Sequence, residues 1–282
     1  MKTCLLANRL RLASGVLMAV VAVGGLGTAH AQNVWTSTAG GNQTWTVTSN
    51  WNTGVFPNAQ SSIADLSQAD FTSNRTISLN ANKIVGFLYV GDTSGTQSTT
   101  ITANQLQLSA TGTGGMVTLS GSGNLIFQSV VALGSNVFVQ ANSSANINFQ
   151  STQTNGLIIS GRVLTNNGTG SGVVTVVPGV SSMNFTSVSG TLIQDSATSM
   201  FRLGNSTSTF AGMSNNTGLV SIRSGTFAYT SNRDDTLGGG TNPNTGMTIE
   251  LGDASGGSKN ATFLVDSTNG AVLTLTLSLI HI

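Results

Sequence analysis

Carboxylates are the side chains with which this chain could do chemistry. Asp234 and Asp235, beside Arg233, are the only adjacent carboxylate pair in the sequence. Such a pair can act as general acid and base on a glycosidic bond, or it can bind calcium. Ser231 before it and Gly238 after it indicate a turn. We interpret the pair as a solvated turn, with calcium contact and catalysis as the alternatives.

The other aspartates of interest stand singly. Asp92, Asp195 and Asp253 lie in Gly/Ser/Thr surroundings. Each is predicted to form a turn by bonding its own backbone. Folding could still gather Asp65, Asp70 or Asp195 onto one face, and the sequence leaves that possibility open.

Histidine and cysteine offer little more. Cys4 and His30 lie in a predicted leader, and His281 lies at the end of the chain. No Ser-His-Asp or Cys-His arrangement and no structural zinc site can be built from them. Thr111–Gly115 lacks the Lys-Ser/Thr of a phosphate-binding loop. We therefore predict no catalytic, cofactor-binding or metal-ligating residue and no cofactor.

Three tryptophans, Trp35, Trp45 and Trp51, are concentrated near the start of the exported part. They could form an aromatic platform for sugar rings. More often such residues plug the open end of a solenoid. We predict a Trp-rich N-terminal cap over about residues 33–58.

Residues 1–31 have the pattern of a secretory signal peptide. Three cations precede an apolar stretch, Leu12–Gly27, and Ala29-His30-Ala31 is a small-x-small cleavage site. The stretch is short and glycine-rich for a membrane span. We expect cleavage after Ala31, and no membrane span once the signal is removed.

The composition limits the partners of the exported part. Charged residues are only 7% of the chain, against roughly 25% in ordinary soluble proteins. The signal contains three of the ten Lys and Arg, so seven cations face nine carboxylates and the formal charge is −2. No basic patch suits nucleic acid or anionic lipid. With 39% hydrophobic residues, the chain should fold.

Short runs of alternating apolar and polar residues predict an all-β protein, and no window after residue 31 predicts a helix. Turn-forming Gly, Asn, Ser and Asp separate the runs. The predicted strands include Thr44–Thr48, Arg75–Leu79, Ile84–Val90, Thr99–Ala103, Gln105–Ser109, Met116–Ser120, Asn124–Gln128, Asn136–Gln140, Asn146–Gln150, Leu157–Ser160, Gly172–Val177, Ser182–Ser187, Leu219–Ile222, Thr226–Thr230, Met247–Leu251 and Ala261–Val265.

These runs fit two architectures. A parallel β-solenoid over residues 32–277 is favoured, because the strands are many and short. We expect coils of about twenty residues, with Asn and Thr ladders whose amides bond between levels. A β-sandwich or jelly roll, with fewer and longer strands, is the alternative.

The stretch Asn33–Asn58 resembles a known motif. Its Trp35, Trp45, Asn50-Trp51 and Pro57-Asn58 are similar to the opening motif of bacterial proteins with autotransporter-associated β-strand repeats. In that family the motif follows the signal peptide and precedes a strand-rich repeat array.

A later stretch, Gly218–Asp253, resembles the repeat of the same family. Ser224–Phe227 precedes a turn with Leu237-Gly238, and a fresh strand follows. The resemblance implies a secreted or surface-displayed β-helical passenger, located outside a bacterium or on its outer-membrane surface.

The C-terminal residues have an unusual pattern. The strand-like run Ala271–Leu277 is followed by Ser278–Ile282, which resembles a translated sequencing-adapter read-through. We interpret residues 278–282 as a non-native tail of a truncated chain. A genuine final core strand is the alternative.

Together these features predict an exported structural or adhesive surface passenger without catalytic activity. Its expected partners are extracellular polysaccharide or the surface of a host or neighbouring cell, and not nucleic acid. The alternatives are a carbohydrate-active β-helix enzyme that uses carboxylates and a purely architectural spacer. Three or more clustered carboxylates on one solenoid face would favour the enzyme.

Overall fold

The fold is known from a computed structural model that describes residues 32–151, 156–176, 190–204, 218–231, 248–252 and 259–267. These residues form short strands, and their only helical segment is a single 3-10 turn, η1 (Thr48–Asn50). The prediction of an all-β protein is therefore confirmed.

The first sheet is a stack of parallel strands, each paired with the strand one level before it. In order it contains β1 (Gln32–Val34), β3 (Ile63–Leu66), β6 (Phe87–Val90), β9 (Gly115–Leu119), β12 (Val137–Ala141), β15 (Val163–Asn166), β17 (Thr191–Asp195), the first part of β19 (Leu219–Ser231) and β20 (Thr248–Leu251).

The second sheet is built in the same way. It contains β2 (Gly41–Thr44), β4 (Arg75–Ser78), β7 (Thr99–Thr102), β10 (Leu125–Phe127), β13 (Ile147–Phe149), β16 (Val173–Val176), β18 (Met200–Leu203), the last part of β19 and β21 (Ala261–Ser267). A third, smaller sheet stacks β5 (Lys83–Val85), β8 (Gln105–Leu108), β11 (Val130–Leu133) and β14 (Leu157–Ile158).

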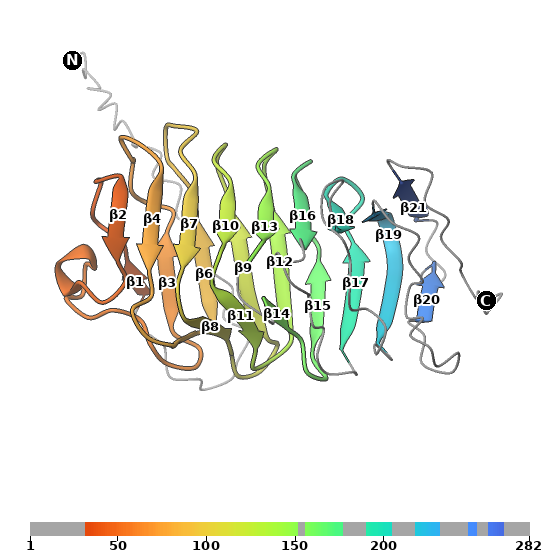
Figure 1. Ribbon diagram of the computed structural model, residues 1–282, viewed down its shortest axis with the longest axis horizontal. Coiled ribbons are helices and arrows are strands. Elements are labelled where there is room, and N and C mark those ends of the chain that lie inside the picture. Colours follow the sequence, from red (N-terminus) through yellow and green to blue (C-terminus); the bar gives the residue numbers. More distant parts are fainter. Residues whose placement is uncertain are drawn as a thin grey trace, which may run out of the picture.

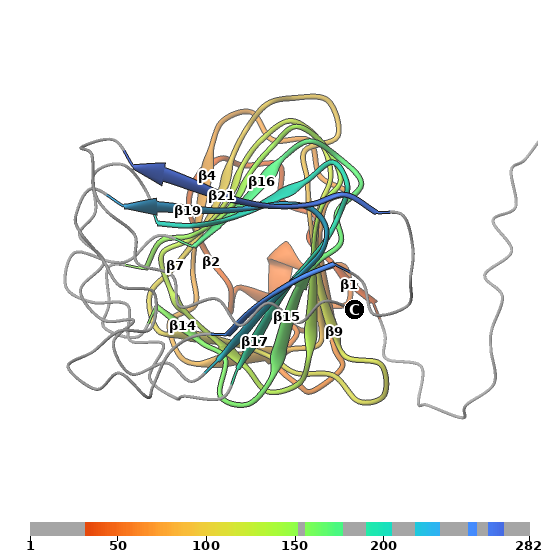
Figure 2. The ribbon, with the colours of Figure 1, turned by 90° about the vertical axis from the view of Figure 1, so that its right-hand side faces the viewer.

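The stacked sheets form a parallel β-solenoid. Successive strands turn around a common axis and rise along it, as Figures 1 and 2 show. The sandwich alternative is wrong, because all pairings among the named strands are parallel. Coils are longer than twenty residues: level partners Thr118 and Gln140 are 22 residues apart, and Asn166 and Gln194 are 28 apart.

The alternation of inward apolar side chains with outward side chains along the strands builds the core. Leu88, Val117 and Val139 are register partners at successive levels of the first sheet, and all three are fully buried. Since neighbouring residues of a strand point to opposite faces, one inward row repeats from level to level. Hydrophobic rows of this kind run along the solenoid.

Strand boundaries differ from the predicted runs where the chain turns a corner. The single strand expected over Ile84–Val90 is two, β5 and β6, separated by Gly86. A Cβ on Gly86 would lie 2.5 Å from Ser61 Cα, so the close approach requires glycine. In the run Thr44–Thr48, β2 ends at Thr44 and a turn follows. Leu219–Ile222 and Thr226–Thr230 belong to the single strand β19.

Several strands lie outside the predicted runs. They are β1, β3, β11, β15, β17 and β18. The predicted run Ser182–Ser187 lies outside the described residues, as do residues 1–31 and 268–282.

A polar ladder follows the corner that precedes the second sheet. Asn74 Oδ1 accepts a hydrogen bond from Ser98 N at 2.8 Å, and Ser98 Oγ accepts one from Asn124 N at 3.1 Å. Asn124 Oδ1 then accepts from Asn146 N, and Asn146 Oδ1 from Val173 N. This ladder bonds side chain to backbone, so it satisfies corner N–H groups. The expected amide-to-amide bond between levels occurs instead between Asn166 and Gln194.

Candidate functional site

The three tryptophans form a buried group in the first coils. Trp35 and Trp45 are fully buried and Trp51 is 2% exposed. The Trp51 ring centroid lies 5.0 Å from that of Trp35 and 5.1 Å from that of Trp45, in edge-to-face contacts. Each indole N–H donates to a backbone carbonyl, those of Ser37, Pro57 and Trp45. No indole face is left open for a sugar ring.

An arginine lies in the core beside this group. Arg75 is 1% exposed, and its register partner at the next level is Thr99. Its Nε donates to Thr99 Oγ1 at 2.9 Å, and its Nη2 donates to Leu66 O at 2.8 Å. The guanidinium carbon lies 3.4 Å from the centre of the Phe71 ring, a cation–π contact. Nη1 is buried without a hydrogen-bond partner.

Asp92 supplies a compensating negative charge for Arg75. Burial lowers the pKa of Arg75 to about 9, and the negative charge of Asp92 opposes that shift. Asp92 is itself buried, and its carboxylate accepts from Phe71 N at 3.2 Å and Gln97 N at 3.3 Å. We call Leu66, Phe71, Arg75, Asp92 and Thr99 the Arg75 cluster.

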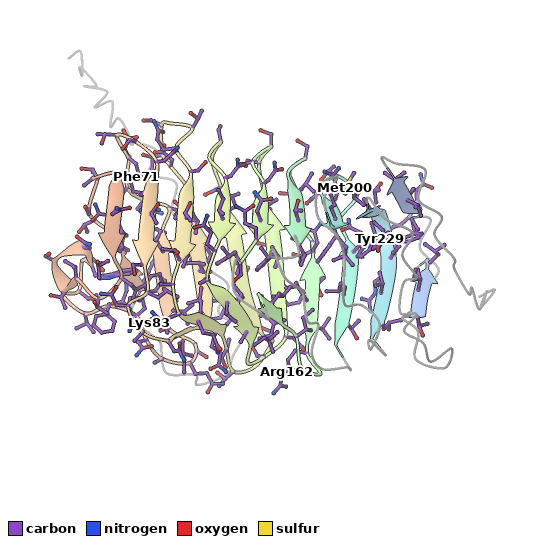
Figure 3. The ribbon with its side chains drawn as sticks, viewed as in Figure 1. Phe71, Lys83, Arg162, Met200 and Tyr229 are labelled. Carbon is purple, nitrogen blue, oxygen red and sulfur yellow. The ribbon has the colours of Figure 1, made fainter. Side chains whose placement is uncertain are left out.

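A second buried cation lies at the same end of the solenoid. Lys83 is 5% exposed, and its Nζ lies 5.0 Å from the centre of the Phe56 ring. Its register partner, Leu106, is a core residue. Phe71 and Lys83 both belong to the N-terminal coils in Figure 3. The cations at this end therefore rest against aromatic rings, where the ring face offsets part of the lost hydration.

The remaining described aspartates bind their neighbours individually. Asp65 Oδ1 accepts from the backbone N–H and hydroxyl of Ser67. Asp70 Oδ1 accepts from Ser94 Oγ at 2.6 Å. Asp92 follows the predicted turn pattern only in part, because it bonds the earlier Phe71 as well as its own loop.

Asp195 forms an ion pair across the last coils. Lys259 Nζ lies 3.2 Å from Asp195 Oδ1, with the two side chains 50% and 30% exposed. Solvent screening makes such an exposed pair weak. The other candidates from the sequence lie outside the described residues: Arg233, Asp234, Asp235, Asp253 and His281.

Metal ligation and membrane insertion can be judged for the described ranges. Within them, no three His, Cys, Asp or Glu side chains are grouped so as to hold a metal ion. Those same ranges include no helix with the length and hydrophobicity to cross a membrane.

A neutral polar network lies deeper along the stack. Asn166 and Gln194 are fully buried register partners, and Asn166 Nδ2 donates to Gln194 Oε1 at 2.9 Å. Gln194 Nε2 donates to the carbonyls of Ser196 and Ser199, both at 2.8 Å. Ser199 Oγ donates to Gly172 O at 2.7 Å. We call Asn166, Gln194, Ser196 and Ser199 the Gln194 network.

The sequence contained a signal for both polar groups. Arg75 shares the inward phase of its strand with Ile77, and Asn166 shares that of Leu164. A polar residue on the apolar phase of an alternating run is therefore a candidate for burial.

Comparison with known proteins gives no relative. No protein-family model matches the chain, and comparisons with curated proteins and with solved structures find no match. The fold and the described residues define the class of protein: a parallel β-solenoid with a tryptophan-filled first coil and two buried polar groups. Function has to be argued from its surfaces and side chains.

Proposed function

We propose that this chain is an exported structural or adhesive surface protein without catalytic activity of its own. The observation that carries the proposal is the use of the carboxylates. Asp65, Asp70, Asp92 and Asp195 each hold a different neighbour in the stack. A carboxylate engaged in this way stabilises the coil and is not presented in a pair that could act on a glycosidic bond.

The outward rows of the sheets support an adhesive role toward polysaccharide or another cell surface. Thr76, Thr100, Ile126, Asn148 and Thr175 are register partners on the outer face of the second sheet, and all are half-buried. Four of these five side chains, all except Ile126, have a hydroxyl or amide group that both donates and accepts hydrogen bonds, so the row suits a neutral, hydroxyl-rich partner.

Export is part of the proposal and has its own test. The pattern of residues 1–31 supports secretion with cleavage after Ala31. N-terminal sequencing of protein recovered outside the cell should begin at Gln32. Recovery of an uncleaved, membrane-retained chain would contradict it.

The absence of catalysis is tested with the purified chain. Pectin, alginate and β-glucans are incubated with it, with and without calcium, and both bound polymer and released products are measured. Binding without turnover supports the adhesive role. Turnover that is abolished by Asp234→Asn or Asp235→Asn, and retained in the control Asp70→Asn, establishes the carbohydrate-active enzyme instead.

A further inference from the structure

The outer face of the first sheet carries a row of large apolar side chains. Phe87, Met116 and Phe138 are register partners on β6, β9 and β12. Each of them alternates along its strand with buried core residues, so each points away from the solenoid axis. All three side chains are half-buried and so remain partly accessible to solvent.

This row lies within the stack and not at one of its ends. In the first sheet β1 and β3 precede the three strands, and β15 and β17 follow them, as Figure 1 shows. The structure describes residues 32–151 without a gap. The next register partner after Phe138 is Thr165, which is polar and buried. The accessible rings therefore do not result from where the described chain ends.

A second outward row lies two residues further along the same strands. It consists of Tyr89, Thr118 and Gln140, which are also half-buried. Thr118 Oγ1 donates to Gln140 Oε1 at 3.1 Å. The hydroxyl and amide groups of this row can donate and accept further hydrogen bonds. We define the two rows together as the outer aromatic face: Phe87, Met116, Phe138, Tyr89, Thr118 and Gln140.

The outer aromatic face is uncharged. In β3, β6, β9 and β12 the only charged residue is Asp65, the register partner of Tyr89. Asp65 is buried, and its carboxylate already accepts hydrogen bonds from Ser67 and from Gln32 Nε2. These strands thus offer no cation to an anionic partner, and the face matches a neutral one.

The spacing of the rings along the solenoid axis matches a repeating polymer. Phe87 and Phe138 are two levels apart, which at about 4.8 Å per level separates them by roughly 9.6 Å. Two sugar units of an extended β-1,4-linked chain span a comparable length, and such a chain repeats its orientation at every second unit. An aromatic ring can pack against the C–H face of a sugar, while hydroxyl and amide groups bond the sugar hydroxyls.

We propose that the outer aromatic face binds a neutral, extended β-1,4-linked polysaccharide, which lies along the solenoid axis across β6, β9 and β12. The rings of Phe87 and Phe138 stack on alternate sugar units, and the neighbouring polar row bonds the sugar hydroxyls. A protein partner fits less well, because a single apolar row is narrower than the apolar centre of a protein interface. The inference rests on the proposed adhesive function, and it places the binding site on the first sheet.

Conservative changes of the rings test this site. The probe is cellohexaose, a neutral β-1,4-linked oligosaccharide, and its dissociation constant is measured by isothermal titration calorimetry on the purified chain. Phe87→Leu and Phe138→Leu keep an apolar side chain and remove the ring, so each should raise the dissociation constant at least about fivefold. Met116→Leu, in the same row, is the matched control and should change it less than about twofold.

Two further measurements separate loss of the ring from loss of the fold. Phe138→Tyr keeps the ring and should bind cellohexaose as the unmodified chain does, and circular dichroism establishes that each variant is folded. An alginate oligosaccharide of the same length tests the neutral character of the site without any substitution. The unmodified chain should bind it at least about fivefold more weakly than cellohexaose, and equal or tighter binding of alginate contradicts the proposal.

The remaining outcomes distinguish this inference from the proposed function. Unchanged affinity in both Phe→Leu variants overturns the inference, and so does equal weakening by Met116→Leu. If Thr100→Ala, on the second sheet, abolishes polysaccharide binding that Phe138→Leu leaves intact, the adhesive function stands and its site is the polar row of that sheet. An unmodified chain that binds neither cellohexaose nor any of the other polymers overturns both the inference and adhesion to polysaccharide.

Discussion

The Arg75 cluster and the Gln194 network both place polar side chains at inward positions of the stack, and they do so in opposite ways. The cluster buries a charge, sets it against the Phe71 ring and leaves Nη1 of Arg75 without a partner. The network buries only neutral groups, and none of its side chains has a buried polar atom that lacks a partner.

The Arg75 cluster and the Gln194 network differ in the free energy that their burial costs. Burying a charge carries a desolvation penalty that nearby dipoles and rings offset only in part. A neutral amide network carries a smaller penalty, but it depends on every member, because each bond satisfies a group that water cannot reach. The network should therefore be the less tolerant of single truncations, and the cluster the more tolerant of losing its charge.

The largest effect is expected from Gln194→Ala. The change removes three hydrogen bonds made by a fully buried side chain and opens a cavity. The free energy of unfolding should fall by about 3 kcal/mol, measured by urea denaturation. Gln140→Ala, on the outer face of β12, is the control and should cost less than about 0.5 kcal/mol. Equal losses would show that the network adds nothing.

A smaller loss is expected from Asp92→Asn. The variant keeps an oxygen that can accept from Phe71 N or Gln97 N, but it removes the charge that opposes the desolvation of Arg75. Unfolding free energy should fall by about 2 kcal/mol. The matched control is Asp70→Asn at an exposed carboxylate, which should change stability by less than about 0.5 kcal/mol. If the control loses as much, the charge of Asp92 has no special role.

Much of the fold followed from local pattern. The alternation of inward and outward side chains along a strand can be read from neighbouring residues. The run Gln105–Ser109, for example, corresponds to the strand β8. The positions of corners depend on contacts between distant residues. The chain turns at Gly86, which lies close to Ser61, and no local sequence pattern indicates that contact. For the same reason the sequence indicated alternating runs and coils of about twenty residues, but not coil lengths that vary from 22 to 28 residues.

The candidate site was less predictable. The sequence singled out Asp92 as a turn residue, and its loop bond to Gln97 agrees with that interpretation. Its proximity to Arg75 depends on which coils stack, and that is a property of the whole solenoid. Trp35 and its neighbours could be placed near one end from their position, but their edge-to-face packing depends on the coil around them.

Replacing the charge itself separates the two groups further. Arg75→Met keeps the length of the side chain and removes the buried charge, so unfolding free energy should change by less than about 1 kcal/mol. Asn166→Leu removes donors and an acceptor that its neighbours need, and it should lower the unfolding free energy by about 2 kcal/mol.

A double substitution tests whether Arg75 and Asp92 are coupled. In the Arg75→Met background, Asp92→Asn should lower the unfolding free energy by less than it does in the native chain. An unchanged cost would mean that the two side chains are not coupled.

The smallest effect is a pH dependence specific to the charged cluster. Burial lowers the pKa of Arg75 well below its ordinary value, to about 9. Above pH 9 the folded chain therefore releases a proton that the unfolded chain still holds, and stability rises with pH. Arg75→Met should abolish that rise, which should be at most about 1 kcal/mol between pH 8 and 10.

The titration of Tyr89 changes stability with pH in the opposite direction, so its contribution has to be separated from that of Arg75. Burial, and then the charge of Asp65, raise the pKa of Tyr89 above 10.0. The unfolded chain loses this phenol proton first, so stability falls as pH rises through 10. The urea midpoint of unfolding, measured between pH 8 and 10.5, should rise with pH more steeply in Tyr89→Phe than in the native chain. In Arg75→Met it should fall as the pH rises.

Gln194→Ala is the control for this comparison. It changes no titrating group, so its urea midpoints should be lower than those of the native chain at every pH but should have the same dependence on pH. A changed slope in Gln194→Ala would mean that the neutral network and the charged cluster are not independent.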